Sequence, residues 1–452
     1  MNLTKKKQSM DMTQGVIWKQ LIAFSIPLLI GNLFQQLYNT VDSIIVGNFV
    51  STEALAAVGS VTPVINMLIG FFTGLATGAG VVISQFFGAK DGERVHKTVH
   101  TTLMMTLVLG VFFTFIGIFM TPFMLRFMAT PDNVMASSSE YLRIYFGGII
   151  GLMLYNMASG IMRAVGDSQR PLYFLIFSSI VNVILDLLFV VGLHMGVAGV
   201  AWATIIAQFA SAALALFSLG RSKGDYRFVP RDLRMDWMIL KKIIRIGLPA
   251  GLQMAVTAFS NVFVQSYINV FGSTCMAGWT SLSKIDQFAL LPMQSLALAA
   301  TTFVGQNLGA NNLARAKRGT RVSLAMSVGI TAVLTVLLLT FSRQMLMLFT
   351  QDADVITYGK LFISVFSPFY VICCANQIFA GSLRGAGDAT GPMLIMLASF
   401  VLFRQLYLYI GTMFTDSLVY VAFGYPAGWV VCSILMVIHY YAGKWQKPYL
   451  AK

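Results

Sequence analysis

The chain has 452 residues, of which 57% are hydrophobic and only 11% are charged, and its formal net charge is +14. A soluble domain carries about 25% charged residues, so the composition argues against a soluble protein and indicates a membrane protein. The basic residues are spread over short segments between long apolar runs, which indicates membrane topology rather than nucleic-acid binding.

The apolar runs are long enough to cross about 30 Å of hydrocarbon, so we predict an all-α membrane protein. Twelve transmembrane helices are expected, at about 16–46, 54–84, 97–121, 134–160, 170–192, 197–220, 237–269, 276–306, 316–342, 354–383, 391–412 and 417–442. The polar segment 222–236 contains Gly and Pro and is the best candidate for a linker. Residues 1–221 and 222–452 would then form two pseudo-symmetric lobes of six helices each.

Short motifs recur between the two halves. Residues 160–171 read GIMRAVGDSQRP, and residues 381–392, which lie 221 positions later, read GSLRGAGDATGP. The same offset relates 85–97 to 306–318, and an offset of 222 relates Pro27 to Pro249. An offset kept over so much of the chain indicates an internal duplication. In a membrane protein, duplicated halves are typical of a transporter whose pathway lies between the repeats.

The basic residues predict the orientation, because most of them lie in or beside alternate loops. They include Lys5, Lys6 and Lys7, several residues of 221–245, Arg315, Lys317, Arg318 and Arg321, and Lys444, Lys447 and Lys452. By the positive-inside rule these segments are cytoplasmic, which places both termini in the cytoplasm of a multi-pass cell-membrane protein. No removable signal peptide is expected, since the first apolar run continues as a helix and lacks an A-x-A cleavage site.

Five ionisable residues fall inside the predicted spans: Asp42, Asp186, Lys284, Asp286 and Arg404. A charge at the centre of a bilayer costs about 2.5–3.5 kcal/mol on insertion scales, so each is a candidate functional residue. Lys284, Asp286 and Arg404 all lie in the second half. We expect them to form a structural ion network, with substrate binding as the alternative.

The two acids of the first half are expected to share one level of the membrane. Asp42 and Asp186 each lie a few residues before the outer end of their helix, and Tyr38 and Asn182 lie one turn from them. Thr204 enters from the outside and reaches a similar depth. Such a cluster can take up a proton or hold a small hard cation such as Na⁺ with oxygen ligands. Packing by hydrogen bonds alone is the competing interpretation.

The stretch PLLIGNLFQQLYNTVDSIIVGNFVSTEALAAVG at 27–59 resembles the multidrug and toxic compound extrusion (MATE) family, as do the paired motifs at 85–97 and 306–319 and both GD-x-x-x-P segments. The resemblance covers nearly the whole chain. It implies two six-helix lobes forming a V, and drug efflux driven by inward H⁺ or Na⁺.

Within that family the chain resembles the DinF-like branch, in which an N-lobe cluster binds the coupling cation. The resemblance implies this role for Tyr38, Asp42, Asn182, Asp186 and Thr204. The NorM-like branch uses C-lobe acids that include a Glu on the seventh helix, where this chain has only Asp236 at the start. Pro27 would bend the first helix and couple the cation to shape, although a static kink explains it equally well.

We therefore predict a cation antiporter that exports amphipathic, cationic compounds by rocker-switch alternating access and works as a monomer. The alternative is a flippase for lipid-linked oligosaccharides or cell-wall precursors, for which Lys284 and Arg404 would supply cavity cations. An enzyme is not expected. The G-x-G-D motif of intramembrane aspartyl proteases occurs at 385–388, but Asp388 falls in a loop. No cofactor is expected, and no metal other than Na⁺ at the Asp42 and Asp186 cluster.

Overall fold

The structure is a computed structural model that describes residues 9–128, 130–443 and 445. The predicted basic positions Lys5, Lys6, Lys7, Lys444, Lys447 and Lys452 lie outside the described residues. Within the described ranges the secondary structure is entirely helical, as the apolar composition predicts. The predicted all-α fold class is therefore confirmed.

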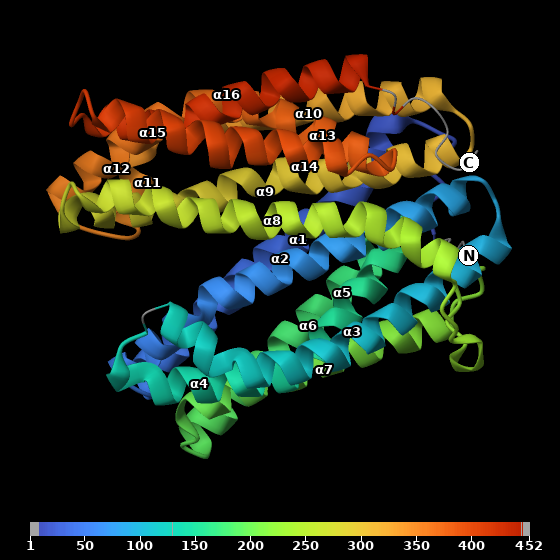
Figure 1. The fold of residues 1–452 in the computed structure, drawn as a ribbon, viewed down its shortest axis with the longest axis horizontal. Coiled ribbons are helices and arrows are strands. Elements are labelled where there is room, and N and C mark those ends of the chain that lie inside the picture. Colours follow the sequence, from blue (N-terminus) through green and yellow to red (C-terminus); the bar gives the residue numbers. More distant parts are fainter. Residues whose placement is uncertain (1–8, 129, 444, 446–452) are drawn as a thin grey trace, which may run out of the picture. The chain divides into compact units, whose positions relative to one another are not determined.

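Every predicted span corresponds to a helix or to a run of consecutive helices (Figure 1). The first half contains α1 (Ile17–Phe49), α2 (Thr52–Gly88), α3 (Gly92–Phe127), α4 (Asp132–Gly147), α5 (Ile149–Ala164), α6 (Gln169–Asp186), the π-helix η1 (Leu187–Gly192) and α7 (Gly196–Gly220). The second half contains the 3₁₀-helix η2 (Pro230–Asp232), α8 (Trp237–Asn269), α9 (Ser273–Gly309), α10 (Leu313–Thr340), α11 (Ser342–Met347), α12 (Ala353–Phe366), the 3₁₀-helix η3 (Ser367–Phe369), α13 (Tyr370–Gly385), α14 (Thr390–Leu397), the π-helix η4 (Ala398–Phe403), α15 (Arg404–Thr412) and α16 (Leu418–Ala442).

Ten helical segments within the described residues are long and apolar enough to cross a membrane. An eleventh is formed by α4 and α5 together, which are bent by 48° at Gly148. The seventh predicted span corresponds to α8, a helix of 33 residues. Its interior carries polar residues, of which Gln253 and Ser260 are buried, because they face the packed interior instead of lipid.

The chain forms two compact units, and two of the three boundaries between them, at 25/26 and 248/249, fall inside helices. The first unit contains the described residues up to Asp11 together with Ile26–Leu248, and the second contains Met12–Ser25 and the described residues from Pro249 onward. Both boundaries lie next to a proline inside a helix, Pro27 in α1 and Pro249 in α8. The predicted division at 221 and 222 follows the sequence repeat and stays a prediction.

The repeated motifs at 85–97 and 306–319 build the same turn between two helices. Lys90 and Asn311, which correspond in the repeat, both adopt a positive φ, of 58° and 56°. The next residue in each copy, Asp91 or Asn312, caps the following helix by accepting a hydrogen bond of 3.0 Å from the backbone three residues on. A left-handed residue followed by an N-cap explains why this short stretch is repeated.

The two GD motifs build a second kind of turn. Gly166 and Gly387 have φ values of 86° and 91°, a conformation that residues with a Cβ rarely adopt. Each is followed by an aspartate whose side chain accepts backbone N–H groups of the next helix: Asp167 from residues 169 and 170, and Asp388 from residue 391. The duplicated sequence therefore encodes helix ends.

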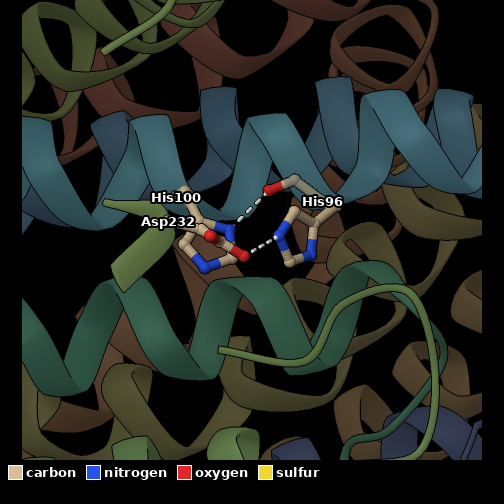
Figure 2. A group of neighbouring side chains, drawn as sticks. All are labelled: His96, His100 and Asp232. Atoms are coloured by element: carbon tan, nitrogen blue, oxygen red, sulfur yellow. Dashed lines mark hydrogen bonds and ion pairs between the residues drawn. The ribbon is translucent and has the colours of Figure 1, made fainter. Parts of the chain in front are cut away.

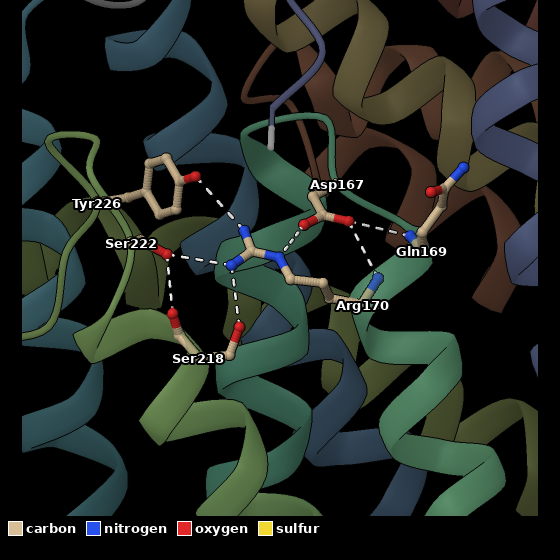
Figure 3. Close-up of polar contacts among 6 residues, drawn as sticks. All are labelled: Asp167, Gln169, Arg170, Ser218, Ser222 and Tyr226. Atoms are coloured by element: carbon tan, nitrogen blue, oxygen red, sulfur yellow. Dashed lines mark hydrogen bonds and ion pairs between the residues drawn. The ribbon is translucent and has the colours of Figure 1, made fainter. Parts of the chain in front are cut away.

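In the first unit the Asp167 turn is held by an arginine network (Figure 3). Arg170 forms an ion pair with Asp167. Its Nη1 donates to Ser218 Oγ at 3.0 Å and to Ser222 Oγ at 3.1 Å, and its Nη2 donates to Tyr226 Oη at 3.4 Å. The guanidinium thus fastens the start of α6 to the end of α7 and to the segment that follows it.

Aromatic side chains form the core of the second unit. Trp279 of α9 contacts Phe362 of α12 edge to face, with ring centroids 5.2 Å apart. Phe366 packs in the same way against Trp429 of α16, at 5.6 Å. All four rings are buried, and such pairs contribute about 0.5–1.5 kcal/mol each beyond the area that they bury. This packing holds α9, α12 and α16 together.

Candidate functional site

The two acids of the first unit meet, although they come from helices far apart in the sequence. Asp42 lies in the C-terminal half of α1 and Asp186 is the last residue of α6. Their carboxyl groups interact directly with one another. Asp186 is fully buried, and the chain passes from an α-helix to the π-helix η1 at the next residue. Single turns of π-helix occur frequently at functional sites.

This acidic pair has no other hydrogen-bond donor among the described residues. Asp42 Oδ1 and both carboxyl oxygens of Asp186 are buried, and no donor from a third residue reaches them; both side-chain polar atoms of Asn182 are likewise buried without a partner. A buried polar group left unsatisfied costs about 1–3 kcal/mol, and a charged one costs more. An arrangement of this kind can take up a proton or a small cation.

A small pocket opens beside the acidic pair. Three of the predicted residues line it, Tyr38, Asn182 and Thr204, together with Leu175, Ser178, Ser179, Ala207 and Gln208. Thr204 Oγ1 donates its hydrogen to the carbonyl of Val200 at 3.0 Å. The hydroxyls of Ser178 and Ser179 also donate to backbone carbonyls. Since their hydrogens are used in this way, these oxygens remain acceptors, which suits a cation.

Two tyrosines beside this site were not predicted from the sequence. Tyr141 and Tyr145 of α4 are both buried, and their rings stack with centroids 6.4 Å apart. Tyr141 interacts with Thr204 and lies within electrostatic range of both carboxyl groups. Their spacing of four residues on one helix face was the available signal. The bend at Gly148, which sets the direction of α4, could not be predicted from that spacing.

The three ionisable residues of the second unit do not form the expected ion network, since no ion pair joins them among the described residues. Asp286 instead accepts a hydrogen bond of 2.6 Å from Tyr370 Oη. Lys284 is exposed, and its Nζ lies 5.8 Å from the ring centre of Phe349. The helix faces separate these residues, and a sequence spacing of two cannot bring Lys284 and Asp286 together.

Arg404 is a buried charge of the second unit and follows directly on the π-helix η4. Its Nη2 donates to Ser260 Oγ at 3.0 Å and to Asn261 Oδ1 at 2.9 Å. The guanidinium lies 4.5 Å from the ring centre of Tyr425, a cation–π contact. Tyr425 corresponds to Thr204 in the repeat, so the two units place different chemistry at equivalent positions.

The remaining predicted positions have structural partners. Pro27 is buried within α1, and its proposed role in bending stays a prediction. Asp388 lies in the turn between α13 and α14, where its carboxylate contacts His439 Nε2 at 2.7 Å and caps the next helix. These contacts account for the G-x-G-D motif as a helix end.

Comparison with known proteins identifies the family. The MatE family profile matches residues 27–188 and 249–410, two segments that begin at Pro27 and Pro249. The probable multidrug resistance protein YoeA of Bacillus subtilis is 31% identical over 96% of both chains. The multidrug export protein MepA of Staphylococcus aureus is 21% identical over 87% of both chains.

Solved structures show the same fold. A transporter of the MOP superfamily from Pyrococcus furiosus superimposes with a TM-score of 0.90, covering 98% of each chain at 24% identity. An outward-facing multidrug resistance MATE family transporter also gives a TM-score of 0.90. The two profile matches, 222 positions apart, agree with the repeat found in the sequence. The chain belongs to the MatE family of membrane transporters, which are not enzymes and in which its curated relatives are named multidrug resistance or export proteins.

Proposed function

We propose that this protein is a secondary active exporter of amphipathic, cationic organic compounds, driven by the antiport of H⁺ or Na⁺. The observation that carries the proposal is the pair of buried carboxyl groups, Asp42 and Asp186, with no donor but each other. Tyr38, Asn182 and Thr204 complete an oxygen-lined site for the coupling cation.

Coupling requires that cation and drug bind with different affinities to different conformations. In the proposed cycle the inward-open transporter takes up the drug, and a rocker-switch motion exposes it to the outside. A cation then enters the acidic pair, repositions α1 near Pro27, and favours release of the drug. We place both termini in the cytoplasm, in agreement with the distribution of basic residues, and expect a monomer.

Of the two cations, H⁺ fits the acidic pair better. Two carboxyl groups in direct contact share one proton readily, since the protonated group donates a hydrogen bond to the other. Sodium is the alternative, because the hydroxyl and amide oxygens of the pocket are ligands that small hard cations accept.

Drug export is favoured over a lipid-linked sugar flippase by the state of the basic residues. A flippase of pyrophosphate-linked substrates needs accessible cations. Arg404 is buried, and its Nη2 already donates to Ser260 and Asn261, whereas the buried oxygens of the Asp42 and Asp186 pair have no donor from another residue.

The deciding experiment measures efflux of a fluorescent organic cation from proteoliposomes, with a pH gradient and a sodium gradient imposed separately. We expect flux to follow the pH gradient in the wild type and to be lost in Asp186→Asn. If a sodium gradient alone stimulates flux, the coupling ion at this site is Na⁺ and not H⁺. Flux that depends on neither gradient would refute antiport.

A further inference from the structure

A cluster outside the transport site brings together three side chains with metal-ligand chemistry (Figure 2). His96 and His100 lie one turn apart on α3, and Asp232 lies on η2 in the polar segment between α7 and α8. His96 Nε2 is 3.0 Å from Asp232 Oδ2. The candidate ligand atoms of all three residues lie within 4.8 Å of one another. We propose that His96, His100 and Asp232 bind a transition-metal ion, with Zn²⁺ as the best fit.

His100 is prepared for this role by its hydrogen bonds. It is 2% exposed, and its Nδ1 lies 2.7 Å from the carbonyl oxygen of His96, which can only accept. The ring hydrogen therefore sits on Nδ1, and Nε2 presents a lone pair. The backbone N–H of Val229 donates to that lone pair at 3.0 Å. Histidine ligands of metals usually donate their second ring nitrogen to a carbonyl or carboxylate, as His100 does.

The geometry suits a tetrahedral ion. Zn²⁺ binds histidine nitrogen at about 2.0–2.1 Å, so ligand atoms at tetrahedral positions lie about 3.3 Å apart. The His96 and Asp232 atoms are already close to that separation. Asp232 is exposed and belongs to a three-residue helix, so it can move closer to His100 when an ion binds. The metal would take the place of the Val229 N–H at His100 Nε2. Two imidazoles and one carboxylate leave a fourth position open for water or for the Val229 carbonyl.

The competing explanation is a simple ion pair between His96 and Asp232, which needs no metal. It leaves out His100, whose ring centre lies only 4.1 Å from that of His96. It also predicts no metal affinity above that of any surface histidine. The metal site is independent of the proposed efflux mechanism, and its bound ion would fasten α3 to the segment that leads into α8.

The first test titrates the full-length protein, purified in detergent without a polyhistidine tag, with Co²⁺ and then competes with Zn²⁺. We expect one equivalent to give visible absorption bands of tetrahedral cobalt. His96→Asn and Asp232→Asn should each weaken binding by at least about 10-fold, since even outer-shell partners contribute 10–100-fold. The control His194→Asn replaces an exposed histidine outside the cluster and should bind as the wild type does. Equal binding by wild type and His96→Asn, or none by the wild type, would overturn the site.

The second test uses trypsin, because Arg231 and Arg234 flank Asp232 and are exposed. Saturating Zn²⁺ should slow cleavage after Arg231 several-fold in the wild type and leave the rate in Asp232→Asn unchanged. The substitutions used in the two tests, His96→Asn and Asp232→Asn, lie at half-buried and exposed positions, so neither test needs a variant of the buried His100 that folds. An unchanged cleavage rate in the wild type would show that no ion bridges α3 and η2.

Discussion

Removing one carboxylate of the acidic pair should weaken the binding of the coupling cation far more than it destabilises the fold. At about 4 Å and an effective dielectric constant of 20, one carboxylate attracts a monovalent cation by about 4 kcal/mol. Since each 1.4 kcal/mol is about tenfold, Asp42→Asn should lower cation affinity by up to about 10³-fold. The substitution keeps the side-chain shape, and it removes a buried charge that has no donor apart from Asp186.

The assay is initial drug flux in proteoliposomes as a function of driving-cation concentration, with Asp42→Asn, Asp186→Asn and the double variant. Because both residues act on the same ion, the double variant should lose little more cation-dependent flux than either single variant loses. Asp286→Asn is the matched control, since that acid lies in the second unit and accepts from Tyr370. If Asp42→Asn keeps the wild-type cation dependence, or if Asp286→Asn loses it equally, the assignment of the site is wrong.

Three further predictions follow from the same structure. Asn182→Ala, Tyr38→Phe and Thr204→Ala should each reduce cation-dependent flux less than loss of either acid, because these groups ligate without carrying charge; unchanged cation dependence in all three would contradict the cluster. Gly166→Ala should lower the thermal midpoint in detergent, because φ is +86° and a Cβ would lie 2.2 Å from the Met10 carbonyl oxygen. In the control Gly59→Ala the new Cβ meets nothing within 4 Å, and the substitution should stabilise α2 by about 0.5–1 kcal/mol. Lys90→Asn should stabilise the fold by up to about 1 kcal/mol and so raise the thermal midpoint, because Asn tolerates the positive φ that its counterpart Asn311 adopts; a lower midpoint would argue against strain at that turn.

The helices could be predicted because each one is an apolar run bounded by polar turns. The runs indicated the order of the helices, and the turns at Lys90 and Asn311 fall within the repeated motifs at 85–97 and 306–319. The bend at Gly148 was not predictable, since it depends on a contact between distant segments: a Cβ there would lie 2.3 Å from the side chain of Ile205. Hydrophobicity alone carries no such information.

The candidate site was predictable in part for the same reason. Asp42 and Asp186 stood out because a carboxylate in an apolar run is costly. The partners of Arg404 were not predictable, because they depend on how each helix is rotated about its axis. The His96 and His100 pair had a visible signal, the i, i+4 spacing, but Asp232 reaches it only through the path of the segment after α7.

The exchange of helix ends at Pro27 and Pro249 has a consequence for biosynthesis. A ribosome that has made only residues 1–221 has not yet supplied Trp237–Leu248, which belong to the first unit. Residues 12–25 are translated early, yet residues that they contact, among them Gln306, Asn307 and Arg315, are translated almost 300 positions later. Neither unit can therefore finish folding as a separate translation product, and a gene cut at the repeat boundary would yield two fragments that each need the other to be complete.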